Sequence, residues 1–205
     1  MRGLIIAVEG VEGAGKSTLA EAIARRVEEQ GHPAVLLRDP GGTALGEKIR
    51  AILLKGEDPR SPVAEAFLFM AARRQLVDER ILPAVEAGET VVLDRFLLSS
   101  LAYQGVAGGV GMDAVLEMGR IAVGDAAPDI TILLDLPIEE GFRRISAGRS
   151  GTDKIEGRGA EYHKAVREGF LLSRRRYPWP VATIDAARPF KEVLAAALEA
   201  LVDVL

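Results

Sequence analysis

The sequence predicts an α/β protein with a doubly wound, five-stranded parallel sheet that is flanked by helices and carries a small lid. Two observations lead to this fold class. A glycine-rich motif at residues 10–17 lies between an apolar run of strand length and an amphipathic segment. In addition, short apolar runs alternate with longer helical patterns along the whole chain, which is typical of β–α–β units with right-handed crossovers.

The glycine-rich motif reads Gly-Val-Glu-Gly-Ala-Gly-Lys-Ser and matches the P-loop pattern G-x-x-x-x-G-K-[ST]. Its glycines allow backbone N–H groups to point inward around a triphosphate, and the positive end of the next helix faces the same phosphates. Lys16 is expected to reach the β- and γ-phosphates, and the Ser17 hydroxyl is expected to hold Mg²⁺. The alternative is a strand–helix turn that binds nothing, but the flanking strand and helix favour a P-loop NTPase. The predicted ATP-binding residues are Gly10, Val11, Glu12, Gly13, Ala14, Gly15, Lys16, Ser17 and Thr18.

The apolar runs and the helical segments give the expected order of elements. Nearly every residue of each run is apolar, which suits strands that are buried on both faces of a parallel sheet. We expect strands at 4–9, 33–37, 90–93, 130–134 and 181–184. We expect helices at 16–30, about 44–54, 62–87, 97–104, 112–122, 137–147, 158–176 and 189–204.

Length and composition narrow the class of protein. The 205 residues suit a single α/β domain, 1–205, with a small lid segment at 147–159 inside it. A net charge of −4 and a pI near 5.4 give no indication of a nucleic-acid partner. The absence of cysteine excludes disulfides and thiolate zinc sites and fits a reducing compartment. The apolar runs are too short for a membrane span and the first strand begins too early for a signal peptide, so we expect a cytoplasmic protein.

Polar side chains follow the predicted strands at their carboxyl ends, where ligands bind in sheets of this kind. The residues expected to converge on one crevice are Glu9, the segment 38–43, the pair Asp94 and Arg95, and Asp135. The carboxylate of Asp94 can support Mg²⁺ or its waters, and the guanidinium of Arg95 can bind a phosphate in a fork. A surface ion pair is the alternative, and the P-loop favours the functional interpretation.

Two further segments carry candidate chemistry. Phe69 and Arg73 lie four positions apart in a predicted helix and therefore share one face. A ring beside a guanidinium suits a nucleotide, although a core phenylalanine with a solvated arginine is the better interpretation of this segment alone. Residues 147–159 contain four glycines and three cations. We interpret them as a lid whose cations close over phosphates, with a solvated charge run as the alternative.

Together these residues resemble the thymidylate kinase family over essentially the whole chain. No piece except the P-loop is decisive, but their order and spacing are specific. The matching segments are 9–18, 38–43, 69–73, 94–95, 99–105, 128–135 and 153–156. The resemblance implies that the γ-phosphoryl group of ATP is transferred to dTMP, with Mg²⁺, to give dTDP for dTTP biosynthesis. It also suggests a homodimer, with apolar helix faces such as 62–80 in contact, and no membrane partner.

Carried over residue by residue, the resemblance implies roles at the acceptor site. Phe69 stacks on thymine, Tyr103 crowds the ribose 2′ position, and Glu12 meets the sugar 3′-hydroxyl. Arg38 and Arg95 hold the acceptor phosphate. The implied dTMP-binding residues are Glu12, Arg38, Phe69, Arg73, Arg95, Ser99, Ser100, Tyr103 and Gln104, and the implied metal-binding residues are Ser17 and Asp94.

The family has two forms, one with an arginine inside the P-loop and one that supplies this cation from the lid. Gly13 occupies the P-loop position here, so the chain resembles the lid form, with Arg149 as the first candidate for the transition-state cation. Lys154 stands where many relatives have arginine, and either it suffices or Arg149 or Arg158 takes the role. The implied catalytic residues are Glu12, Lys16, Arg95, Arg149 and Lys154. Other departures from the family pattern are Asp39 in place of Glu, Met70 in place of an aromatic residue, and Phe96 in place of Tyr.

Two other functions stay open on the sequence alone. One is another nucleotide or nucleoside kinase of the same fold, because the identity of the base rests on the resemblance. The other is a regulatory P-loop switch that hydrolyses nucleotide slowly, although the sequence lacks the Asn-Lys-x-Asp motif with which a GTPase reads guanine.

Overall fold

A computed structural model describes residues 2–56, 58–148, 158–202 and 204. Its centre is a five-stranded, all-parallel sheet with the strand order β2-β3-β1-β4-β5. The strands are β1 (Ile5–Gly10), β2 (Ala34–Arg38), β3 (Thr90–Asp94), β4 (Ile130–Asp135) and β5 (Val181–Asp185). All five predicted strands are present, and each end differs from the prediction by one residue or less. The doubly wound α/β prediction is confirmed.

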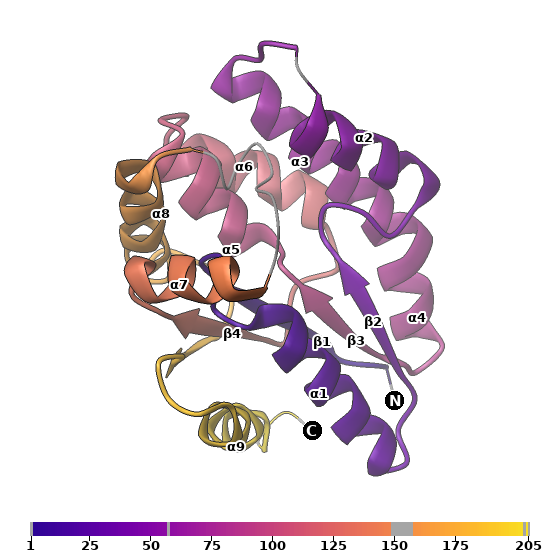
Figure 1. Cartoon of the computed structure of the whole chain (residues 1–205). Helices are drawn as coiled ribbons and strands as arrows, with labels where there is room; N and C mark the ends of the chain where they lie inside the picture. The colour runs from indigo at the N-terminus through magenta and orange to yellow at the C-terminus, as the bar shows by residue number, and fades with distance from the viewer. Residues whose placement is uncertain (1, 57, 149–157, 203, 205) are drawn as a thin grey trace.

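Helices lie on both faces of the sheet and make three layers (Figure 1). Helices α1 and α9 cover one face, and the larger group of helices that includes α3, α5 and α8 covers the other. The helices are α1 (Lys16–Glu29), α2 (Ala44–Lys55), α3 (Pro62–Leu76), α4 (Leu82–Glu86), α5 (Leu97–Ser100), α6 (Met112–Val123), α7 (Ile138–Gly148), α8 (Ala160–Ser173) and α9 (Phe190–Leu201). Among the helices described, none combines the length and the apolar character that crossing a membrane requires.

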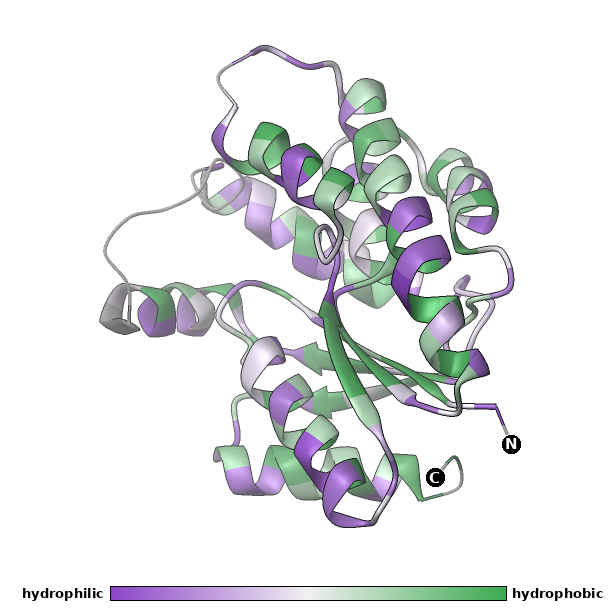
Figure 2. Cartoon of the chain, turned by 90° about the vertical axis from the view of Figure 1, so that its right-hand side faces the viewer, coloured by the Kyte–Doolittle hydropathy of each residue, from purple (hydrophilic) through white to green (hydrophobic). Residues whose placement is uncertain are grey.

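The core follows from the apolar runs. Every residue of β1 is buried, and so are the first four of β3 and the first five of β4, whereas the edge strands β2 and β5 are only partly buried. Figure 2 shows the sheet as a largely hydrophobic layer between helices that alternate between hydrophobic and hydrophilic faces. Apolar strands with helices on both faces are what a parallel sheet requires. The central strand pairs on both sides, with Ile6 opposite Val92 and Ile130.

Two predicted helices are wrong in their internal geometry. The segment expected as one helix at 62–87 is α3 and α4 with a wider π-helical turn, η1 (Val77–Ile81), between them. Pro83 explains the change, because it has no N–H to donate and its ring crowds the carbonyl four residues earlier. The helix expected at 97–104 is α5 followed by a second π-helical segment, η2 (Leu101–Ala107).

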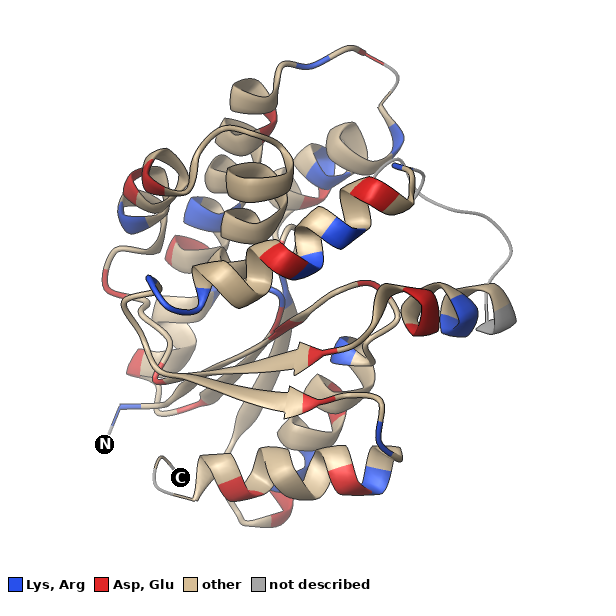
Figure 3. Cartoon of the chain, turned by 90° about the vertical axis from the view of Figure 1, so that its left-hand side faces the viewer, with Lys and Arg blue, Asp and Glu red and all other residues tan. Residues whose placement is uncertain are grey.

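The topology creates a crevice at the carboxyl end of β1. The chain passes from β1 to β2 on one side of the sheet and later crosses from β3 to β4 on the other side of β1. The connections that leave neighbouring strands therefore run in opposite directions at this point, and they leave room for a ligand. In Figure 3 the strand arrows point toward α7, whereas both chain ends lie at the opposite end of the sheet.

The turn after β1 approaches α7 at two glycines. A Cβ atom added to Gly13 would lie 2.3 Å from the carbonyl oxygen of Gly141, and one added to Gly141 would lie 2.4 Å from the carbonyl oxygen of Glu12. Gly13 also has φ 74°, a left-handed conformation that side chains disfavour. The first turns of α7 thus lie directly against the P-loop backbone.

Alanine substitutions at Gly13 and Gly15 separate this steric contact from backbone strain. Both residues have positive φ, 74° and 89°, but a Cβ at Gly15 meets no atom within 4 Å. Gly15→Ala is expected to destabilise the nucleotide-free protein by about 1–2 kcal/mol through strain alone. Gly13→Ala adds a clash worth about 1–3 kcal/mol and should unfold at a clearly lower temperature. Equal thermal shifts for the two variants would contradict the described contact.

Candidate active site

The predicted site residues meet at one cavity of about 440 Å³ at the carboxyl end of the sheet. Fourteen of them line it: Glu12, Gly13, Gly15, Lys16, Ser17, Thr18, Phe69, Arg73, Asp94, Arg95, Ser99, Ser100, Tyr103 and Gln104. Six other residues also line it: Asp39, Pro40, Arg50, Leu54, Arg144 and Ile145. Asp39 and Pro40 belong to the segment 38–43 that was expected at the crevice, whereas Arg50, Leu54 and Ile145 were not predicted. Of the remaining predictions, Gly10, Val11 and Ala14 form the buried base of the P-loop. Arg149 and Lys154 lie outside the described residues.

The P-loop end of the cavity is built for anions. The ammonium of Lys16, at the first position of α1, donates to the carbonyl oxygen of Val11 at 2.6 Å. Burial and the nearby charge of Arg95 lower the pKa of Lys16 to about 8, against the opposing effect of carboxylates such as Glu12. A buried ammonium at a helix N-terminus is therefore held where phosphate oxygens would complete its hydrogen bonds.

The hydroxyl of Ser17 and the carboxylate of Asp94 lie together beside Lys16. Ser17 Oγ donates to Asp94 Oδ2 at 2.6 Å. A hydroxyl and a carboxylate are oxygen ligands of the kind that Mg²⁺ prefers, and Mg²⁺ in nucleotide sites uses few protein ligands because phosphates and waters supply the rest. The described residues contain no cluster of three or more His, Cys, Asp or Glu side chains that could hold a metal by themselves. This pair fits a nucleotide-bound Mg²⁺.

Glu12, Arg95 and Tyr103 form a charged cluster in the middle of the cavity. Arg95 Nη2 donates to Glu12 Oε1 at 3.1 Å, and the Tyr103 hydroxyl donates to the same oxygen at 2.5 Å. The guanidinium of Arg95 also lies over the Tyr103 ring, 5.2 Å from its centroid. Burial acts to raise the pKa of Glu12, but the hydrogen bond from His163 and the charges of Arg95 and Lys16 outweigh it, so the pKa lies well below its usual range. Glu12 is an anion at neutral pH.

Glu9 fixes the loop that carries Arg95. Its Oε1 accepts the backbone N–H groups of Phe96 at 2.9 Å and Ser99 at 3.0 Å, and its Oε2 accepts the Ser99 hydroxyl. Among the described residues, Arg95 is the only non-glycine residue with positive φ, 71°. The fully buried carboxylate thus over-determines a turn that would otherwise be strained. Burial raises the pKa of Glu9 from 4.5 to about 7, although the hydrogen bonds from Ser99 oppose this.

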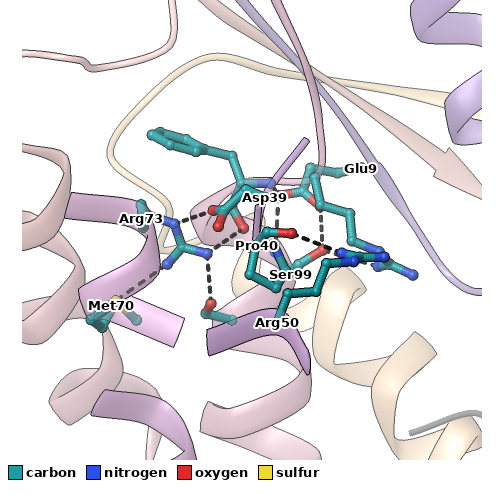
Figure 4. Close-up of polar contacts among 10 residues, drawn as sticks. Glu9, Asp39, Pro40, Arg50, Met70, Arg73 and Ser99 are labelled. Atoms are coloured by element: carbon teal, nitrogen blue, oxygen red, sulfur yellow. Dashed lines mark hydrogen bonds and ion pairs between the residues drawn. The ribbon is translucent and has the colours of Figure 1, made fainter. Parts of the chain in front are cut away.

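Arg73 lines the cavity on the same side as Phe69 and is paired, not solvated. Its side chain is 1% exposed, and Nε donates to Asp39 Oδ2 at 2.5 Å. Nη2 donates to the Phe96 carbonyl at 3.1 Å and to Ser100 Oγ at 2.9 Å, and Nη1 faces the Met70 sulfur at 3.2 Å (Figure 4). This arrangement excludes the solvated-arginine interpretation. Asp39 holds Arg73, a role that its position after β2 did not reveal.

The structure differs from the sequence-based expectation for two arginines, Arg38 and Arg50. Arg38 forms an ion pair with Glu47 at 3.0 Å and does not line the cavity. Arg50, on α2, does line it and donates to the carbonyl oxygen of Pro40 at 2.8 Å (Figure 4). No local motif marks Arg50, because it is one of several cations along an exposed helix. Its place in the cavity depends on how α2 packs.

The side of the cavity near Phe69 also contains residues that the sequence motifs did not indicate. Gln104 Nε2 donates to Glu65 Oε1 at 3.2 Å, and Arg158, the last cation of the predicted lid, pairs with Glu65 Oε2 at 2.5 Å. Glu65 precedes Phe69 by one helical turn on a largely apolar segment. A carboxylate four positions before Phe69, in a segment that is otherwise largely apolar, is the sequence signal that could have identified Glu65.

Comparison with known proteins identifies the family. The model of the family described as thymidylate kinase matches residues 8–197. The chain belongs to the thymidylate kinase family. It is 41% identical over 195 residues to a thymidylate kinase of Caldanaerobacter subterraneus subsp. tengcongensis, covering 95% of this chain and 91% of that protein. It is 44% identical over 188 residues to a thymidylate kinase of Chlamydia trachomatis serovar D, covering 91% and 92%.

Membership in the thymidylate kinase family establishes the class of reaction. The chain is a nucleotide-binding transferase with thymidylate kinase activity, which phosphorylates dTMP, and the family uses ATP. The kinase prediction is therefore confirmed over a regulatory switch. The fold and a P-loop at the carboxyl end of β1 agree with it.

The raised pKa of Glu9 gives a pH-dependent prediction. Between the usual carboxyl pKa of 4.5 and the folded value of about 7, the folded chain retains a proton that the unfolded chain has released. The stability contributed by this proton is therefore lost as pH rises through that window. Relative to Glu9→Gln, which cannot titrate, the wild type should lose up to about 3 kcal/mol of unfolding free energy between about pH 5 and about pH 8. Urea unfolding of both proteins measures it, and a pH-independent difference would refute the assignment.

Proposed function

We propose that this one cavity at the carboxyl end of the sheet holds both ATP and dTMP, end to end, so that the γ-phosphoryl group passes directly from donor to acceptor phosphate. The observation that carries this proposal is that the P-loop lysine, the Glu12–Arg95–Tyr103 cluster and Phe69 all line one cavity. Both substrates need an anion site, and the cavity offers cations from the P-loop, from the turn after β3 and from α2. Transfer between two phosphates then requires no water-filled gap.

The donor end uses the P-loop. Backbone N–H groups of the loop and the Lys16 ammonium bind the β- and γ-phosphates of ATP. Ser17 and Asp94 would hold Mg²⁺, which when bound neutralises negative charge on the phosphates. The hydrogen bond between these two side chains supports the assignment, because it places both oxygen donors together before any nucleotide binds.

The acceptor end positions dTMP. Phe69 stacks on the base, and Tyr103 closes the space beside the ribose 2′ position. Glu12 accepts a hydrogen bond from the 3′-hydroxyl. Arg95 and Arg50 hold the acceptor phosphate. Arg50 takes the role at this phosphate that the sequence suggested for Arg38. Arg50 is preferred because it lines the cavity, whereas Arg38 is committed to Glu47.

Ser99, Ser100 and Gln104 complete the acceptor end as polar neighbours of the substrate, and Arg73 orients the base side. The acceptor phosphate is already a nucleophile at neutral pH, so no strong general base is needed. Catalysis then consists of positioning and of charge neutralisation during transfer. Lys16, Arg95 and a lid cation supply that charge.

The chain is further proposed to be the form that supplies its catalytic cation from the lid, 147–159, within a single domain, 1–205. The contact between Gly13 and Gly141 supports this, since no side chain fits at the P-loop position where the other form carries arginine. Arg149 is the first candidate and Lys154 the second. Arg158 is the third lid cation, and its ion pair with Glu65 favours a role elsewhere.

We also propose that the protein is a homodimer. Val63 and Phe67 on α3 are 45% and 57% exposed, and Leu45 and Ile52 on the neighbouring α2 are 46% and 44% exposed. Large apolar side chains gathered on adjacent helices are typical of a surface that another protein covers. A second copy of the chain is the occupant that the family resemblance suggests.

The decisive experiment measures ADP release from ATP and Mg²⁺ with dTMP, dUMP, dCMP, UMP, AMP or thymidine as acceptor. Strong stimulation is expected with dTMP, weak stimulation with dUMP and none with thymidine, which lacks the phosphate that Arg95 and Arg50 would hold. Lys16→Ala should reduce turnover by more than about a hundredfold and serves as the control for contaminating activity. Strong stimulation by thymidine, or full activity of Lys16→Ala, would contradict the proposed site.

The two lid cations are distinguished by matched substitutions. Arg149→Ala should lower kcat by more than about tenfold with little effect on dTMP affinity, because its charge acts on the transferring group. Lys154→Ala removes a charge from the same segment and should change kcat by less than about threefold. Steady-state kinetics and dTMP titration measure both. The reverse order of effects would assign the cation to Lys154.

A further inference from the structure

Three segments that are distant in sequence meet behind Gln104. Glu65 is in the first turn of α3, Gln104 is in η2, and Arg158 lies just before α8. Glu65 and Gln104 are 7% and 2% exposed, so their polar atoms rely mainly on partners within the protein. No part of the proposed mechanism uses Glu65 or Arg158.

The hydrogen bonds in this cluster have a definite direction. Glu65 Oε2 accepts from Arg158 Nη2 at 2.5 Å, and Glu65 Oε1 accepts from Gln104 Nε2 at 3.2 Å. Arg158 is held in turn by the Tyr162 hydroxyl at 2.8 Å and lies 4.8 Å from the centroid of that ring. Both oxygens of Glu65 thus accept a hydrogen bond, one from a guanidinium and one from an amide, and a carboxylate has no hydrogen to donate in return.

The carboxylate of Glu65 therefore determines which way the Gln104 amide faces. A primary amide has a donor end and an acceptor end of nearly the same shape. The donor end of Gln104 is bound to Glu65, so the carbonyl oxygen is the end available to a ligand in the cavity that Gln104 lines. Turning the amide over would place its carbonyl against a buried carboxylate and leave two acceptors without a donor, which is costly in a dry site.

An acceptor at this position selects among pyrimidine bases. The ring N3–H is the only hydrogen-bond donor of thymine, and uracil shares it, whereas N3 of cytosine is an acceptor. A fixed carbonyl oxygen can therefore bind the first two bases and is repelled by the lone pair of the third. A site that leaves a buried polar group unpaired with the wrong substrate discriminates strongly.

We propose that Glu65, through its charge, is a specificity-determining positioning residue, which orients Gln104 so that the site selects a pyrimidine with a ring N–H donor over cytosine. This inference rests on the proposed placement of the base between Phe69 and Gln104. Glu65 does not touch the substrate and acts through the amide that does.

The test compares kcat/KM for dTMP with kcat/KM for 5-methyl-dCMP, which keeps the methyl group and changes only the hydrogen-bonding edge. The wild type should prefer dTMP by more than about a hundredfold. Glu65→Gln preserves shape but can present either a donor or an acceptor, so Gln104 can turn over. The preference should then fall at least about tenfold. A purely structural role for Glu65 would lower both kcat/KM values together and leave their ratio unchanged.

Arg158→Gln is the matched control. It breaks the same ion pair but leaves a carboxylate facing Gln104, so the dTMP preference should stay within about threefold of the wild type. If Glu65→Gln does not fold, the double variant Glu65→Leu/Arg158→Leu removes both charges together, a change that buried ion pairs often tolerate, and should show the same loss of preference.

Gln104→Leu separates this inference from the proposed function. It should reduce the dTMP preference by itself, and adding Glu65→Gln to it should cause no further reduction, because the two residues act through one hydrogen bond. If Gln104→Leu has no effect, the proposed base placement is wrong and the inference fails with it. If Gln104→Leu lowers the preference but Glu65→Gln does not, or if Glu65→Gln is equally effective without Gln104, the inference alone is overturned.

Discussion

The carboxylate of Glu9 ties the strand that carries the P-loop to the segment that carries Arg95. Glu9 lies on β1 immediately before the P-loop, and its partners are two backbone N–H groups and one hydroxyl from the segment after β3, at sequence separations of 87 and 90 residues. These bonds hold the turn in which Arg95 adopts φ 71°. Because β1 carries the P-loop and β3 leads into Arg95, this buried carboxylate and the pairing of β1 with β3 together fix how Arg95 lies relative to the P-loop. Positioning of this kind is what phosphoryl transfer between two anions requires.

A second buried carboxylate, that of Asp39, fixes the segments on the side of the cavity near Phe69. Asp39 and Arg73 are 0% and 1% exposed, and the guanidinium also binds Ser100 and the Phe96 carbonyl. Removing two charges from water costs free energy that their attraction only partly offsets, so such a pair is weak grounds for stability. Its consequence is geometric, since a guanidinium with three fixed partners holds α3, the loop after β2 and the start of α5 in one arrangement.

The helix that follows the predicted lid packs directly behind the substrate-facing residues. A Cβ at Gly169 of α8 would lie 3.0 Å from the Cα atom of Ala102, so a larger residue there would have to push α8 and η2 slightly apart. Phe170 then contacts the Tyr103 ring edge to face, with centroids 5.9 Å apart. The wider turns of η2 bring Tyr103 and Gln104 to the cavity while their backbone remains hydrogen-bonded. Helix α8 therefore packs directly against the segment that supplies Tyr103 and Gln104 to the cavity.

The sequence by itself determined the strands, most of the helices, the P-loop and the residues that follow each strand, because these depend on local periodicity and on glycine geometry. It also determined the family. The tertiary structure alone decided that Arg73 is paired with Asp39 across 34 positions, that Arg50 rather than Arg38 lines the cavity, and that Glu65 faces Gln104. A charged side chain can choose among several partners of opposite charge, and only the packing of helices onto the sheet brings one of them within reach. Local sequence patterns therefore do not determine which partner the side chain binds.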